Sequence, residues 1–317
     1  MSDPVLGLCL AALADGPLDQ ALAAAAELSL TVVDLPTDTI SALGRSLPQP
    51  DDVAGMVADA GLRVHCVSNS RDAQLLLGPN GPHTDAACPG TARAKAEHAR
   101  RMALEAIELA CVLGAPLVRL LLGCPDFGRW FRWSGSEVGW DDNVEAYVEA
   151  AVPLAEVAER HGVRLCIEPH VKQVAFDVPS LVACVAGLRR AGTDPAVCFD
   201  PANVAALGFD PVDFLHATGL APACVHAKDL QRSTGPVPPT GHGWVRYGPQ
   251  PAIRFRSVPW GILDWPAILT GLHEVGFEGP LLIEHEDVVV GRRPGIAQAR
   301  DHLLSLALGE ESEEPWW

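Results

Sequence analysis

Four stretches decide the fold of this chain: RLCIEPH at residues 164–170, AVCFDPAN at 196–203, ACVHAKD at 223–229 and PLLIEHED at 280–287. Each begins as an apolar run of the kind that forms a buried β-strand. Each run then reaches an ionisable side chain, which is Glu168, Asp200, His226 or Glu284. A buried carboxylate is costly unless it is paired, so these four strand ends require a common partner.

Short apolar runs followed by Ala-rich helical stretches repeat along the whole chain. One helical stretch, residues 142–162, starts at an Asp and closes at a Gly, which are common helix start and stop signals. The runs expected to be strands lie at residues 5–10, 31–35, 63–68, 117–122, 164–168, 196–200, 223–228 and 280–285. Eight β–α units predict an α/β protein, a single-domain (β/α)8 TIM barrel over residues 1–309 with an acidic C-terminal tail at 310–317. The alternative is a doubly wound open sheet, which the lack of a G-x-G-x-x-G turn after the first run disfavours.

A barrel core takes about 250 residues, so part of this 317-residue chain must lie in loops. Two long irregular segments are expected to hold the surplus, residues 124–140 and 230–262. They follow the fourth and seventh strands, which places both at the C-terminal mouth, where barrel enzymes keep their active sites.

Charge and composition exclude several classes of protein. The formal net charge of −17 argues against a nucleic-acid partner, because such binders present basic surfaces. The first residues have no basic segment and Asp15 and Gly16 interrupt their apolar run, so we expect no signal peptide and no membrane span, and a cytoplasmic protein. Nine cysteines without C-x-x-C spacing argue against a disulfide framework and a structural zinc site.

In a barrel, the last four strands are neighbours and their C-terminal residues can point into one cavity. We therefore predict that Glu168, Asp200, His226 and Glu284 are ligands of one divalent metal ion, which would offset the burial of three carboxylates. This oxygen-rich donor set with one imidazole suits Mn²⁺ best, and Mg²⁺, Co²⁺ and Zn²⁺ stay open. For any single acidic residue, the alternative is a helix N-cap or a surface ion pair.

Alternation along the strands extends the pattern in both directions. Two residues before the ligands stand Cys166, Cys198, Cys224 and Leu282, which we expect to fill the barrel below the metal as apolar side chains. Two residues after the ligands stand His170, Lys228 and Glu286, which point to the same mouth. His170 and Lys228 are predicted to bind the substrate, and the alternative is a capped loop or a solvated charge.

These motifs, with RSVPWGILDWPAILTGLHEVGFEGPLLIEHED at 256–287, resemble the xylose isomerase-like barrel superfamily, in particular its sugar phosphate isomerase/epimerase proteins. The resemblance covers most of the chain and is strongest from residue 140 onward. It implies that the four strand-end residues are metal ligands. It also implies that Glu168 and Glu284 are catalytic and exchange protons with the carbon beside a metal-bound carbonyl.

One position departs from the family pattern. Many relatives carry a histidine three residues after the aspartate, where this chain has Asn203. DNA-repair nucleases of the superfamily use that histidine in a multi-zinc cluster, so its absence and the acidic charge argue against a nuclease. Asn203 is predicted to hydrogen-bond a substrate hydroxyl, and the alternative is a turn residue after Pro201.

The two long segments contain five of the eight tryptophans. Flat aromatic faces suit sugar rings, so Trp133 and Trp260 are candidate substrate contacts. The alternative is that these rings pack the loops onto the barrel or form a subunit interface. Arg256, just before VPWG, is a candidate for binding a phosphate or carboxylate.

The sequence thus predicts a metal-dependent isomerase or epimerase of a sugar, keto-sugar or cyclitol. The closest alternative is a lyase with the same metal and base, either a dehydratase or a C-glycoside deglycosidase subunit acting on 3-keto-glycosides. A further alternative is a non-catalytic sugar-binding subunit. The expected partner is a small-molecule carbohydrate, and the resemblance implies a possible homo-oligomer or partner subunit.

Overall fold

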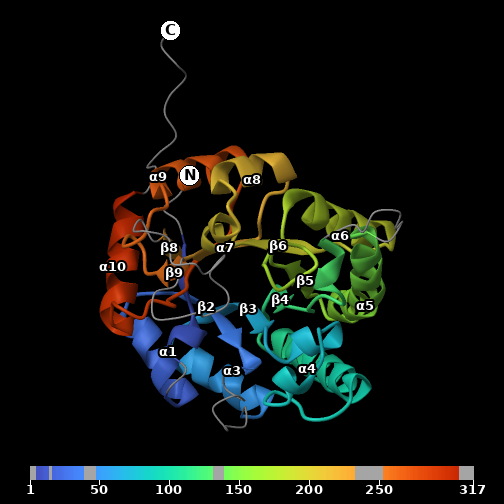
Figure 1. Ribbon diagram of the computed structural model, residues 1–317. Helices are drawn as coiled ribbons and strands as arrows, with labels where there is room; N and C mark the ends of the chain where they lie inside the picture. The colour runs from blue at the N-terminus through green and yellow to red at the C-terminus, as the bar shows by residue number, and fades with distance from the viewer. Residues whose placement is uncertain (1–4, 14–15, 39–47, 131–138, 233–252, 307–317) are drawn as a thin grey trace.

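A computed structural model describes residues 5–13, 16–38, 48–130, 139–232 and 253–306. All eight predicted strands are present and form one closed barrel, in the order β1-β10-β7-β6-β5-β4-β3-β2. Their bounds are β1 Leu6–Cys9, β2 Val32–Pro36, β3 Arg63–Asn69, β4 Leu117–Leu120, β5 Arg164–Ile167, β6 Ala196–Phe199, β7 Cys224–Ala227 and β10 Leu281–Ile283. Figure 1 shows these strands at the centre of a ring of helices. The predicted (β/α)8 barrel is confirmed.

The helices that cover the barrel are α1 Leu18–Glu27, α3 Pro50–Asp59, α4 Ala92–Val112, α5 Asp141–Arg160, α6 Val178–Arg190, α7 Pro201–Ala206, α8 Pro211–Thr218, α9 Trp265–Glu274 and α10 Arg292–Ser305. Each turns an apolar stripe inward. In α5 the buried stripe includes Tyr147, Ala151, Leu154 and Ala158, which recur at helical spacing. This helix ends just before Gly162, which adopts φ +72° and lets the chain turn toward β5. The stop signal read from the sequence is therefore the one the fold uses.

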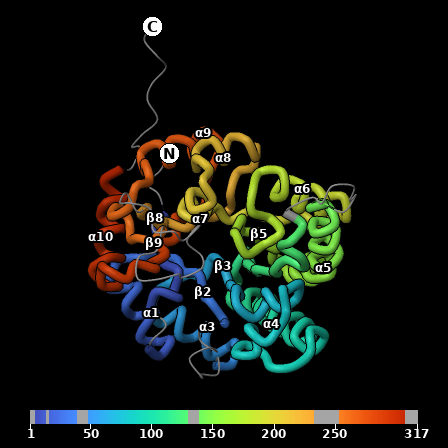
Figure 2. Tube along the Cα trace, in the orientation of Figure 1, coloured from blue at the N-terminus to red at the C-terminus, as the bar shows by residue number. Residues whose placement is uncertain are grey.

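The barrel closes where its first strand, β1, pairs with its last, β10. Leu6, Gly7 and Leu8 of β1 pair in parallel with Leu281, Leu282 and Ile283 of β10. The blue and red ends of the trace accordingly lie side by side in Figure 2. All eight barrel strands are parallel to their neighbours, and their C-terminal ends surround one mouth.

Below that mouth, buried apolar side chains fill the interior of the barrel. One buried cluster fills it, consisting of Val32, Cys66, Leu117, Cys166, Ala196, Cys198, Cys224 and Leu282. The predicted inward positions Cys166, Cys198, Cys224 and Leu282 all belong to it and are 0% exposed. The thiols thus act as small apolar side chains in a packed layer.

The loops at the mouth carry structure that the sequence did not indicate. The loop after β7 contains an antiparallel pair, β8 Asp229–Arg232 and β9 Ile253–Arg256, in which Asp229 pairs with Arg256. The connection between β3 and α4 is also long and contains the 3-10 turns η2 Ala73–Leu76 and η3 Pro82–Thr84. Within the described residues, the β3–α4 connection thus takes up part of the surplus length, in addition to the two predicted segments. The predicted acidic tail, residues 310–317, lies outside the described residues.

No described helix combines the length and the apolar character needed to cross a membrane.

Candidate metal and substrate site

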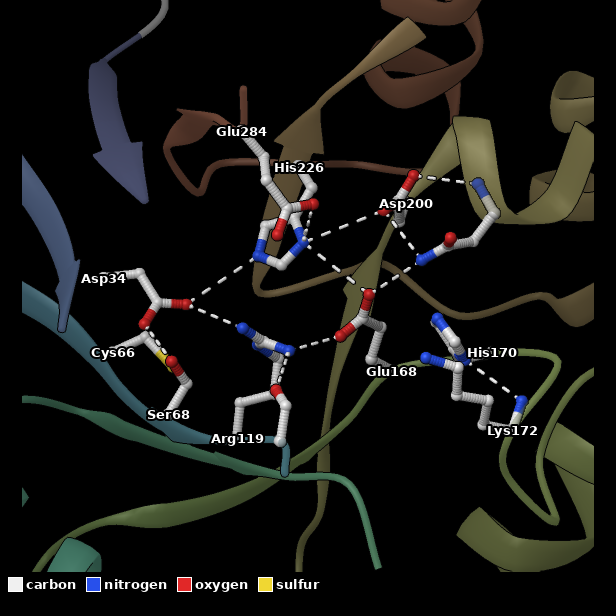
Figure 3. Close-up of polar contacts among 12 residues, drawn as sticks. Asp34, Cys66, Ser68, Arg119, Glu168, His170, Lys172, Asp200, His226 and Glu284 are labelled. Carbon is white, nitrogen blue, oxygen red and sulfur yellow. Dashed lines mark hydrogen bonds and ion pairs between the residues drawn. The ribbon is translucent and has the colours of Figure 1, made fainter. Parts of the chain in front are cut away.

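The four predicted ligands come together at the mouth of the barrel (Figure 3). Glu168, Asp200 and Glu284 directly follow β5, β6 and β10, and His226 is the third residue of β7. Asp200 and His226 are 0% exposed and Glu168 is 4% exposed. Because the strands are parallel and adjacent, side chains at their ends converge without any help from the loops.

The distances around the imidazole of His226 fit a bound cation. Its Nδ1 atom lies 3.7 Å from Glu168 Oε1, 3.9 Å from Asp200 Oδ2 and 3.5 Å from Glu284 Oε2. One ligand atom each from Glu168, Asp200 and His226 all lie within 4.8 Å of one another. Ligands held at roughly 2.0 to 2.2 Å from a cation are spaced roughly 3 to 4 Å apart, so the group has the size of a coordination site.

Both ring nitrogens of His226 are buried and have no hydrogen-bond partner among the residues that the structure describes. Such an imidazole has lost its hydration, and the carboxylate oxygens around it, at 3.5 to 3.9 Å, are too far away to replace it with hydrogen bonds. A cation at Nδ1 would satisfy the nitrogen that faces the carboxylates. The donor set of Glu168, Asp200 and His226 therefore fits a divalent metal ion, and Glu284 lies next to it.

The two oxygens of Asp200 face different partners. Oδ1 accepts hydrogen bonds from the backbone N–H groups of Ala202 at 2.8 Å and Asn203 at 3.0 Å, so it caps α7. Oδ2 points to the other ligands (Figure 3). Burial raises the pKa of Asp200 to about 6. The N-cap reading is thus correct for one oxygen and leaves the other available as a ligand.

Lys228 lies among the carboxylates. Its Nζ is 2.9 Å from Asp200 Oδ2, 2.7 Å from Glu284 Oε2 and 3.1 Å from Glu286 Oε2. It also lies 4.3 Å from the ring centroid of Phe255, a cation–π distance. The ammonium group therefore neutralises part of the acidic cluster, and its stem lines the cavity above it.

A second cation, absent from the predicted site residues, lies beside Glu168 and Asp34 (Figure 3). Arg119 of β4 donates hydrogen bonds to Glu168 Oε2 and, at 3.2 Å, to Asp34 Oδ2 of β2. Ser68 of β3 donates to the other oxygen of Asp34. Burial by itself would raise the pKa of Glu168, but Arg119, His226 and His170 together outweigh it and hold that pKa well below its usual value. Glu168 is therefore fixed as a carboxylate.

Above these groups lies a cavity of about 460 Å³. Of the predicted residues, it is lined by Glu168, Glu284, His170, Asn203 and Lys228. Asn203 Nδ2 donates to Glu168 Oε1 at 3.0 Å and to Asp200 Oδ2 at 2.8 Å, while its Oδ1 has no hydrogen-bond partner in the ranges that the structure describes. Burial lowers the pKa of His170 to about 3, so its ring is neutral, and Nδ1 accepts a hydrogen bond from the backbone N–H of Lys172.

The other predicted substrate contacts are placed differently. Arg256 donates to Asp287 Oδ2 at 2.8 Å and to Gln231 Oε1 at 2.7 Å, and it does not line the cavity formed by the described residues. Trp260 is 53% exposed, and its indole N–H donates to Gln298 of α10. Trp133 lies outside the described residues. Of the loop aromatics, Trp140 packs edge-on against Phe176 with a centroid distance of 5.0 Å, as the packing alternative expects.

Comparison with known proteins places the chain in a family. Its sequence matches the family model of the xylose isomerase-like TIM barrel over residues 22–306. The chain therefore belongs to that family, as the motifs at the strand ends predicted. A search of curated proteins gave no match.

Solved structures share the fold at low sequence identity. A xylose isomerase-like TIM barrel protein from Mycobacterium smegmatis in complex with magnesium is 17% identical, with a TM-score of 0.65 over 96% of each chain. An L-ribulose 3-epimerase is 15% identical, with a TM-score of 0.67 over 95% of this chain and 93% of that one. A probable 3-DHS dehydratase from Bacillus anthracis is 12% identical, with a TM-score of 0.64 over 94% of this chain and 98% of that one. At these identities the likeness is one of fold.

Proposed function

We propose that this protein is a divalent-metal-dependent isomerase or epimerase of a sugar, keto-sugar or cyclitol. The observation that carries the proposal is the buried imidazole of His226, which has no hydrogen-bond partner within the described part of the chain and lies below the cavity among Glu168, Asp200 and Glu284. These four residues would hold the cation, with Mn²⁺ as the leading candidate and Mg²⁺, Co²⁺ or Zn²⁺ as alternatives. A cation there would act as a Lewis acid on a carbonyl or hydroxyl oxygen.

The chain's own residues would carry the proton transfer. Glu168 and Glu284 both line the cavity, so each can reach a carbon atom of a substrate within it. They differ in their surroundings. Both oxygens of Glu168 accept hydrogen bonds, from Arg119 and Asn203. Oε2 of Glu284 has no hydrogen-bond donor among the described residues and lies at ion-pair distance from Lys228 and His226. Glu284 is therefore the more available base, and Glu168 is the more firmly oriented one.

The neutral polar groups would orient the sugar. Asn203 is fixed by its two donated hydrogen bonds, which leaves Oδ1 as an acceptor for a substrate hydroxyl after a small adjustment. His170 is uncharged at neutral pH and can hydrogen-bond without attracting a proton from the acidic groups. Lys228 can donate to a substrate oxygen where it now donates to Glu286.

A lyase is the second candidate, and Asp38 favours it. This carboxyl group lines the cavity, and burial raises its pKa. Its place on the cavity wall makes this carboxyl group a candidate for protonating a leaving hydroxyl. The fold shared with the probable dehydratase is consistent with this candidate. The mass of the product separates the two reactions, because isomerisation leaves it unchanged and elimination lowers it or splits the substrate.

The test begins with metal content. Protein purified without chelator would be analysed by plasma mass spectrometry beside Glu168→Gln and Asp200→Ala, with the surface substitution Glu274→Gln as the matched control. We expect about one metal ion per chain in the wild type and control and its loss in both site variants. Keto-sugars and 3-keto-glycosides would then be incubated in D₂O, and deuterium uptake at carbon is expected only with metal. No bound metal after Mn²⁺ is added would overturn the proposed mechanism in favour of the sugar-binding subunit.

A further inference from the structure

One wall of the cavity comes from the segment between β3 and α4. His83, Thr84, Ala86 and Ala87 of this segment line the cavity. Its regular structure is limited to the short turns η2 and η3, which bury few side chains. Contacts with the rest of the fold must therefore hold this wall in place.

The first contact fixes the start of the wall to the end of β4. Gly78 and Gly123 form a parallel β-bridge. The backbone N–H of Leu77 donates to Leu122 O at 3.0 Å, and that of Cys124 donates to Gly78 O at 2.9 Å. These bonds end at residue 78, before the residues that face the cavity.

The second contact is a buried ammonium group. The side chain of Lys95, near the start of α4, is 1% exposed. Its Nζ donates to Gly81 O at 2.6 Å, Thr84 Oγ1 at 2.9 Å and Asp85 Oδ1 at 2.6 Å. An ammonium group has three N–H donors, and here each has an acceptor within residues 81–85.

The position of this lysine is unfavourable for the helix itself. A positive charge in the first turns of a helix opposes the helix dipole, and burial removes the hydration of the ammonium group. The bonds to residues 81–85 offset both costs. Lys95 and the wall are therefore matched to each other, and a neutral side chain would remove one donor from each of three acceptors in residues 81–85.

We propose that Lys95 is a positioning residue for substrate binding, which fixes residues 81–88 as the wall that sets the shape of the substrate cavity. This inference rests on the proposed sugar isomerase or epimerase function for its substrate. Lys95 touches neither the candidate ligands nor the reacting atoms. Its loss should therefore weaken substrate binding and leave metal binding and the chemical step nearly unchanged.

The test compares Lys95→Met with Arg93→Met. Both remove one positive charge near the start of α4, but Arg93 is 89% exposed and pairs with Glu97 on the outer surface. Asp85→Asn is a milder second variant, since it removes one acceptor's charge and leaves the two others. Hydrogen exchange is followed at Thr84, Asp85, Ala87 and Cys88, whose amides bond within the segment. Exchange should be on the order of tenfold faster in Lys95→Met than in Arg93→Met or the wild type, with Asp85→Asn between them.

Kinetics on the keto-sugar that the wild type turns over supply the second readout. KM should rise on the order of tenfold in Lys95→Met, with kcat within about twofold and the Mn²⁺ dissociation constant unchanged. If hydrogen exchange in Lys95→Met equals that of the wild type, or if its KM equals that of Arg93→Met, the inference about Lys95 is wrong. The proposed function would still stand in that case, because it depends on metal binding and turnover by the wild type. If the wild type binds metal but turns over no sugar, the proposed function fails and the substrate role of Lys95 fails with it. Faster exchange in the variant would then mark Lys95 as a purely structural tether.

Discussion

Replacing Arg119 with methionine tests whether the buried ion pairs beneath the site hold it together. The guanidinium bridges Glu168 and Asp34, and all three side chains are at most 5% exposed. Methionine has a similar length but supplies no charge and no donor. The change leaves two buried carboxylates without their counter-charge. Removing one partner of a buried pair costs about 3 to 5 kcal/mol, so we expect a loss of that size in the free energy of unfolding at pH 7.

The loss should depend on pH in a defined direction. In the wild type, burial alone would raise the pKa of Glu168 and Asp34, but Arg119 lowers both. Their contribution to stability is therefore present above about pH 4 and is lost as the pH falls through the lowered values. Without the guanidinium, burial prevails and both groups gain stability by protonation as the pH falls. The gap between variant and wild type should be largest at pH 7 and should narrow toward pH 4.

Urea unfolding of metal-free protein, with chelator present, measures this gap at pH 7, 5.5 and 4. Arg164→Met is the matched control, because Arg164 begins the neighbouring strand β5 and pairs with Asp194 at the surface, where it is 43% exposed. A surface pair contributes about 0 to 1 kcal/mol. If Arg119→Met loses no more than this control, or if the gap widens as the pH falls, the account of the buried bridge is wrong.

Other changes give outcomes of definite sign. Burial would raise the pKa of Asp287, but Arg256 and backbone N–H groups lower it to about 2. In urea unfolding, Asp287→Asn should therefore lower the free energy of unfolding by about 1 to 2 kcal/mol at pH 7, after discounting for solvent screening. This loss should disappear as the pH falls through about 2. Lys228→Met should tighten Mn²⁺ binding about tenfold by calorimetry, because it removes a positive charge 2.7 Å from Glu284. Weaker binding would mean instead that the ammonium group keeps the candidate ligands ionised. Gly123→Ala should cost about 2 to 4 kcal/mol, because φ is +90° and its Cβ would lie 2.4 Å from two carbonyl oxygens. Gly55→Ala, which meets nothing within 4 Å in α3, should add about 0.5 to 1 kcal/mol.

The barrel and the four strand-end residues were predictable because their signals are local. Each strand is a short apolar run, and a candidate ligand interrupts each of the last four runs at or near its end. Parallel pairing then converts equal positions along different strands into nearness in space. Glu168, Asp200, His226 and Glu284 could thus be grouped without knowledge of any contact between them.

Arg119 and Asp34 could not be found in the same way. Each is a single charged residue within an apolar strand, and the two are 85 residues apart in the chain. Only the register of β2, β3 and β4 decides that both point inward. The available signal was a charged residue within a predicted barrel strand, whereas the site was predicted from ionisable residues at strand ends alone.

Arg256 illustrates a second limit. It was assigned to the substrate because it stands beside a family motif, yet it belongs to β9, whose pairing with β8 places it next to Asp287 and Gln231. The hairpin spans a long connection, and pairing between distant segments leaves little trace in sequence periodicity. Lys95 is similar, since a lysine in a helix reads as a solvated charge until its burial is known.

The closure of the barrel by β1 and β10 also has a consequence for biosynthesis. Glu284 follows β10, the strand that completes the ring by pairing with the first strand of the chain. A nascent polypeptide that has exposed only β1 to β7 carries three of the four proposed ligands but has no closed ring to orient them. A cation that binds the closed ring alone would draw newly made chains toward the finished barrel by mass action. The yield of folded protein in living cells would then depend on the metal supply during synthesis, before any substrate is met.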